Sequence, residues 1–129
     1  MFEFSKQSEE NMEGVDPRLK AIAHKALGLS PIDFGIPGSG GLRTEQQQHE
    51  LYLAGKSQLD GRLKLSKHQT GLALDFYAYV DGRASWQPQH LTMVAAAFLQ
   101  AASLLGYRLT WGGLWKTFID MPHVQLEAK

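Results

Sequence analysis

The stretch that decides the fold of this 129-residue chain runs from Ser66 to Val80 and reads S-K-H-Q-T-G-L-A-L-D-F-Y-A-Y-V. Its part from Leu72 onward is rich in apolar and aromatic residues, which predicts a strand at least partly inside the core. A carboxylate in such a strand is costly unless it is paired, hydrogen-bonded or bound to a metal. Asp75 is therefore a candidate functional residue.

Two further segments can bring polar side chains to Asp75. Thr70-Gly71 supplies a bend before the strand, so that His68 can fold back toward the carboxylate. Near the C-terminus, Asp120 and His123 lie in F-I-D-M-P-H-V-Q, where the proline prevents a helix. We expect a turn there that directs both side chains into one cleft.

The residue types in these segments favour a metal site. His68, His123 and Asp75 offer two imidazoles and a carboxylate, and catalytic zinc sites use three such ligands with water in the fourth position. Asp120 is then a second carboxylate near the metal, and such a group can serve as the base for the water. The chain has no cysteine, so thiolate ligands are excluded.

The two motifs together carry a resemblance to a known family. S-x-H-x-x-G-x-A-x-D, followed by W-G-G-x-W-x-x-F-x-D-x-P-H-x-Q over Trp111 to Gln125, resembles the VanY-type (LAS) zinc peptidases of bacterial cell-wall peptides. Within that group the chain is most similar to the L-alanyl-D-glutamate endopeptidases that bacteriophages use as endolysins. The likeness extends over nearly the whole chain and includes Val15–Leu19, Gly41–Thr44 with Gln47, Leu51-Tyr52 and Gly55–Ser57.

The resemblance implies a function and a set of site residues. It implies a Zn²⁺ cofactor held by His68, Asp75 and His123, with Asp120 as general base. It also implies that Arg43 polarises the substrate carbonyl or holds a carboxylate. The substrate would be the peptidoglycan stem peptide, hydrolysed at its L-alanyl-D-glutamate amide bond during host lysis.

Two departures from the family pattern bear on this reading. Relatives that cut D-alanyl-D-alanine usually have Glu three residues before the last histidine, whereas this chain has Asp120. That favours the endopeptidase over a D-alanyl-D-alanine carboxypeptidase or dipeptidase, and an intact Asp120 also argues against a non-catalytic metal-binding module that recognises the wall. The glycine-rich Gly35–Gly41 segment is the second departure, and it leaves the placement of Arg43 open.

Composition limits the other possibilities. The 13 basic and 13 acidic residues give zero formal charge, so there is no global electrostatic case for a nucleic-acid partner. The N-terminus has no basic start followed by an apolar stretch, so no signal peptide is expected. No apolar run approaches the roughly 20 residues of a membrane span, so membrane insertion is not expected. We expect a monomer that accumulates in the host cytoplasm and reaches the wall after release by a separate pore-forming protein.

The remaining pattern predicts an α+β fold, a small antiparallel sheet with helices packed on it and the zinc site in a cleft at the sheet. Residues 1–129 are expected to form one catalytic domain without a separate wall-binding domain. Capping signals and periodicity predict helices from Pro17 to Leu29, from Thr44 to Gly55 and from Gln89 to Leu105. Short strands are expected over 107–111 and 124–126, a turn at Asp81-Gly82, and a polar loop over 56–66 beside the site. Trp111, Trp115 and Phe118 could form a stacking platform for sugar rings or nucleic-acid bases, but beside the metal motif they are expected to pack around the last ligand.

Overall fold

The computed structural model describes residues 2–128 and has the expected α+β class. The elements in chain order are α1 (Lys6–Asn11), α2 (Pro17–Leu29), β1 (Asp33–Gly35), α3 (Glu45–Leu53), the 3₁₀ helix η1 (Lys67–Thr70), β2 (Ala73–Asp75), β3 (Tyr77–Val80), β4 (Arg83–Ser85), α4 (Pro88–Leu105), β5 (Arg108–Trp111), the 3₁₀ helix η2 (Gly112–Leu114) and β6 (His123–Glu127).

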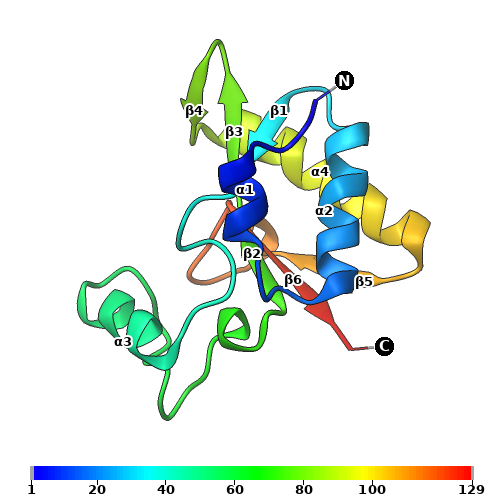
Figure 1. Cartoon of the computed structure of the whole chain (residues 1–129). Helices are drawn as coiled ribbons and strands as arrows, with labels where there is room; N and C mark the ends of the chain where they lie inside the picture. Colours follow the sequence, from blue (N-terminus) through cyan, green and yellow to red (C-terminus); the bar gives the residue numbers. More distant parts are fainter. Residues whose placement is uncertain (1, 129) are drawn as a thin grey trace.

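The two longest helices, α2 and α4, pack against each other beside the sheets (Figure 1). Asp16 caps α2 by accepting a hydrogen bond from the backbone N–H of Arg18, and Pro17 occupies the first helical position. Helix α4 ends at Gly106, whose φ of 82° is left-handed and costs glycine little. Both helices confirm the sequence prediction, with α4 beginning one residue earlier than expected.

Helix α3 also begins as predicted. Thr44 and Gln47 form a reciprocal capping box, in which each side chain bonds the backbone N–H of the other residue. The helix projects away from α2 and α4 at the left of Figure 1. It carries the chain to the loop over residues 55–66, which returns to the site at η1.

The strands form two three-stranded antiparallel sheets, ordered β1-β3-β4 and β2-β6-β5. The expectation of one sheet, with a single strand from Leu72 to Val80, is wrong. The chain changes partners at Phe76, whose backbone N–H donates to the carbonyl of Pro122. The alternation of apolar residues continues through Phe76. It predicts an extended conformation, but it does not show which strand β2 or β3 pairs with.

Phe76 also joins the sheets to the helical layer. Its ring stacks on Phe98 of α4 with centroids 5.2 Å apart, and Phe34 of β1 lies 5.2 Å from Phe98. All three side chains are buried. The core therefore fixes the point at which β2 ends, immediately after Asp75.

Besides the 3₁₀ helices η1 and η2, three elements were not predicted from sequence: α1, β1 and β4. They are six, three and three residues long, which is too short for hydrophobic periodicity to distinguish from loop. The turn between β3 and β4 is confirmed, with φ values of 53° at Asp81 and 78° at Gly82.

Candidate active site

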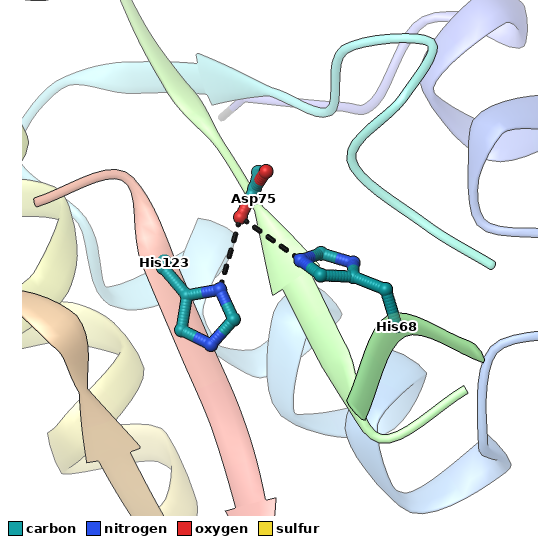
Figure 2. Close-up of side chains that lie close together, drawn as sticks. All are labelled: His68, Asp75 and His123. Atoms are coloured by element: carbon teal, nitrogen blue, oxygen red, sulfur yellow. Dashed lines mark hydrogen bonds and ion pairs between the residues drawn. The ribbon is translucent and has the colours of Figure 1, made fainter. Parts of the chain in front are cut away.

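Three side chains predicted as metal ligands lie together where β2, β6 and η1 meet. Figure 2 shows the Asp75 carboxylate between the imidazoles of His68 and His123. Asp75 Oδ1 is 3.2 Å from His68 Nε2 and 3.2 Å from His123 Nδ1. The three candidate ligand atoms all lie within 4.8 Å of one another.

His68 is held by the turn that carries it. Ser66 caps η1, and Gly71 ends it with a φ of 76°. The imidazole is 2% exposed, and its Nδ1 lies 2.9 Å from the backbone carbonyl oxygen of Gly41. A carbonyl can only accept, so Nδ1 carries a proton and Nε2, beside Asp75, is the nitrogen left to bind a metal.

Asp75 and His123 are brought together by strand register. They are direct partners across the β2–β6 ladder, and directly opposed side chains on one face of an antiparallel pair lie close together. His123 presents Nδ1 to Asp75, while its Nε2 lies 2.9 Å from Gln125 Oε1. The two histidines thus direct different nitrogens to the same point.

This arrangement fits a zinc ion. Ligand atoms about 2.1 Å from one ion at tetrahedral angles are separated by roughly 3.4 Å, close to the two 3.2 Å separations found here. The donor set of two imidazoles and one carboxylate is also of the kind zinc prefers. Burial alone would raise the pKa of Asp75, but the adjoining side chains of His123 and His68 outweigh it and hold that pKa far below its ordinary value.

Asp120 lies beside the three candidate ligands without joining them. Its Oδ2 is 3.9 Å from His123 Nδ1, and its side chain is 47% exposed. Burial raises the pKa of Asp120, and the negative charge of Asp75 raises it further. The backbone holds the residue in place, because its N–H donates to the carbonyl of Gly112 and its carbonyl accepts from His123.

Arg43 contacts the outer side of Asp75. Its Nη2 donates to Asp75 Oδ2 over 2.9 Å, and the side chain is 11% exposed. Nη1 donates to Gln48 Oε1 over 3.0 Å, while the amide nitrogen of Gln48 donates to Ser57 Oγ and to the carbonyl of Leu59. Gln48 is fully buried and was missed from sequence, because its helix shows little amphipathic pattern.

The glycine-rich segment before Arg43 is ordered by close packing against the site. The carbonyl of Gly40 accepts from the backbone N–H of Asp75, and the N–H of Arg43 donates to the carbonyl of His68. A Cβ at Gly41 would come within 2.0 Å of the carbonyl oxygen of Asn11. These glycines permit close backbone approach, which fixes Arg43 and supplies the carbonyl that orients His68.

An open cleft of about 820 Å³ surrounds these groups. The predicted polar loop over 56–66 forms part of one wall, and residues 115–120 form part of another. Trp111 is buried as expected, and the ring of Trp115 lies 5.2 Å from that of His123. The expectation for Phe118 is wrong: it is 67% exposed at the cleft, on a left-handed backbone with φ 52°.

Comparisons with known proteins identify the family of this chain. A model of the phage L-alanyl-D-glutamate peptidase family matches residues 1–126. The chain belongs to this family. The resemblance inferred from the two sequence motifs is thereby confirmed.

Individual relatives and a solved structure support the same assignment. The L-alanyl-D-glutamate peptidase of Escherichia phage T5 is 40% identical over 120 residues, which span 92% of this chain and 85% of that protein. The peptidoglycan L-alanyl-D-glutamate endopeptidase CwlK of Bacillus subtilis is 30% identical over 97 residues, 67% of this chain and 57% of that protein. The crystal structure of Serratia marcescens L-Ala D-Glu endopeptidase ChiX matches with a TM-score of 0.85 and 40% identity, covering 96% of this chain and 89% of ChiX.

Within this family member, Gly112 controls where Asp120 lies. A Cβ at Gly112 would come within 2.3 Å of the Asp120 carbonyl oxygen, so Gly112→Ala must push the two segments apart. We expect the rate of peptidoglycan hydrolysis to fall by up to roughly a hundredfold, as a displacement of about 1 Å can cause, while the three candidate ligands stay in place. Gly28→Ala is the matched control, since a Cβ there meets nothing within 4 Å. Equal rates for the two variants would contradict this account of Gly112.

Proposed function

We propose that this protein is a zinc-dependent endopeptidase that hydrolyses the L-alanyl-D-glutamate amide bond of the peptidoglycan stem peptide. The observation that carries the proposal is the cluster of His68, Asp75 and His123 facing Asp120 in one cleft. The bond to be cut is inferred from the names of the family and of its relatives, which specify L-alanyl-D-glutamate.

Zinc would be held by His68 Nε2, the Asp75 carboxylate and His123 Nδ1. When bound, it supplies a Lewis acid that polarises the scissile carbonyl and makes water more acidic. The other ring nitrogen of each histidine contacts the protein: His68 Nδ1 lies 2.9 Å from the carbonyl oxygen of Gly41, and His123 Nε2 lies 2.9 Å from Gln125 Oε1.

Asp120 is the proposed general base. Its carboxylate lies beside the cluster and reaches the cleft, so it can take a proton from the attacking water and return one to the leaving amine nitrogen. Its raised pKa makes it a better proton acceptor than an ordinary aspartate.

Arg43 is the proposed second catalytic residue. Three of its N–H donors bond Ser39, Gln48 and Asp75, which fixes the planar guanidinium at the wall of the cleft. We propose that its remaining N–H groups stabilise the negative charge that develops on the scissile carbonyl oxygen.

The proposed biological setting is lysis of a bacterial host by a phage endolysin. In residues 2–128, no helix combines the length and apolar character needed to cross a bilayer. We propose that the protein acts as a monomer from the host cytoplasm, with a separate pore-forming protein giving it access to the wall. Because the cleft draws on residues from Arg43 to Gln125, we also propose that residues 1–129 form one catalytic unit.

Mass spectrometry of digested peptidoglycan tests the choice of bond. We expect fragments with D-glutamate or D-isoglutamine at a new amino terminus, and little free D-alanine. The same walls treated with Asp120→Asn protein provide the blank. Free D-alanine as the main product would replace this proposal with a D-alanyl-D-alanine carboxypeptidase.

A further inference from the structure

A series of hydrogen-bonded polar side chains extends from His123 along one face of β6. His123, Gln125 and Glu127 alternate with buried Val124 and Leu126, so all three point to the same side of the strand. Gln125 Oε1 lies 2.9 Å from His123 Nε2, and Gln125 Nε2 lies 2.7 Å from Glu127 Oε1. The other carboxylate oxygen of Glu127 is 2.9 Å from Lys67 Nζ.

Which group donates and which accepts in each hydrogen bond of this series is set at the end far from His123, at Lys67 and Glu127. The ammonium of Lys67 can only donate, and a carboxylate can only accept. Glu127 therefore requires the NH₂ group of Gln125, which turns the amide oxygen of Gln125 toward His123. An amide oxygen requires a donor, so His123 must carry its proton on Nε2. Nδ1, which lies 3.2 Å from Asp75 Oδ1, is then the nitrogen left to bind a metal.

Glu127 is suited to this role because it stays ionised. The hydrogen bond from Gln125 lowers the pKa of Glu127, and the contact with Lys67 lowers it further against the opposing effect of partial burial. Lys67 also directly precedes His68 in η1. The series of hydrogen bonds thus links the two segments that carry the histidine ligands.

We propose that Lys67, Glu127 and Gln125 are positioning residues that fix the tautomer of His123, so that its Nδ1 binds the metal. This inference rests on the proposed metal site. His68 needs no such support, because a backbone carbonyl fixes its tautomer. The metal affinity of this protein therefore depends on Glu127, a side chain whose carboxylate contacts no ligand.

Two single substitutions test the inference through zinc affinity, measured by competition with a chelator. Gln125→Leu removes the acceptor for His123 Nε2–H. Glu127→Gln lets the amide at position 125 turn its NH₂ group toward His123, which favours the wrong tautomer. Each should weaken zinc binding by about 10- to 100-fold, as loss of an outer-shell partner does. Gln58→Leu is the matched control, because Gln58 lines the same cleft without a hydrogen bond to these residues.

A double substitution separates positioning from a general effect on folding. Gln125→Glu combined with Glu127→Gln exchanges the two groups, so that a carboxylate at position 125 accepts from His123 and from the amide at position 127. The amide oxygen at position 127 can still accept from Lys67. Zinc affinity should recover relative to Glu127→Gln alone, although the double variant carries one more change.

A second readout follows the proton itself. Long-range ¹H–¹⁵N spectra of zinc-loaded wild-type protein should place the His123 proton on Nε2. Wild-type affinity for Glu127→Gln and Gln125→Leu, or no recovery in the exchanged variant, would overturn the inference. Failure of the wild-type protein to bind zinc at all would instead overturn the proposed function.

Discussion

His68→Ala and His123→Ala should each abolish zinc binding and peptidoglycan hydrolysis together. Each removes one of three proposed ligands whose candidate atoms lie within 4.8 Å of one another, and the two that remain cannot complete a catalytic zinc site. Zinc affinity should fall by more than the roughly 10- to 100-fold typical of a lost outer-shell partner. Metal analysis after dialysis gives the stoichiometry, which should be near one zinc per chain for the wild-type protein.

His24→Ala is the control for this comparison. His24 pairs with Glu9 on the surface and lies outside the cleft, so its substitution should leave both zinc content and hydrolysis at the wild-type level. Full zinc occupancy in His68→Ala and His123→Ala would show that the ligands have been assigned wrongly.

Asp120→Asn and Asp75→Asn should have different effects, because Asp120 is the proposed general base and Asp75 a proposed zinc ligand. Asparagine at position 120 keeps the shape of the side chain but cannot take a proton, so zinc content should stay near that of the wild type. The rate of hydrolysis should fall by about 100- to 10,000-fold, the usual loss for a general base. Asp75→Asn removes the charge that both histidines contact, so metal and activity should fall together, and added zinc should restore part of the activity.

The two variants are compared in the same assay of zinc stoichiometry and wall lysis. Loss of metal from Asp120→Asn would make Asp120 a ligand. Lysis by Asp120→Asn within a few-fold of the wild-type rate would exclude it as the base.

Much of the fold follows from local signals in the sequence. The proline and aspartate at the start of α2 and the glycine after α4 give bounds that the structure reproduces within one residue. What could not be predicted is strand pairing. The run from Leu72 to Val80 keeps its alternation while it passes from one sheet to the other, and the change depends on contacts with Pro122 and with β1.

For the site, the sequence places His68, Asp75 and His123 together because two motifs of recognisable spacing carry them. The sequence could not show how the site is supported. Gln48 is buried on a helix without a clear apolar face, and its partners at Ser57 and Leu59 lie on a loop. The positions of Gln125 and Glu127 could have been predicted, because alternate residues of a strand lie on the same face and these two follow His123 at that spacing.

The sequence also could not show which side chains are exposed at the rim of the cleft. Phe118 is close to Asp120 and aromatic, so packing around the ligands was the natural expectation. Its backbone instead adopts a left-handed conformation, and the ring is directed to the surface. Aromatic character alone does not distinguish a core position from the edge of a binding cleft.

Anomalous diffraction from crystals grown with zinc, recorded above and below the zinc absorption edge, would locate the metal and so test the proposed zinc site. We expect one strong peak about 2.0–2.2 Å from His68 Nε2, an Asp75 carboxylate oxygen and His123 Nδ1, with Asp120 outside that distance. A peak elsewhere, or an Asp120 oxygen bound to the ion at the same distance, would contradict it.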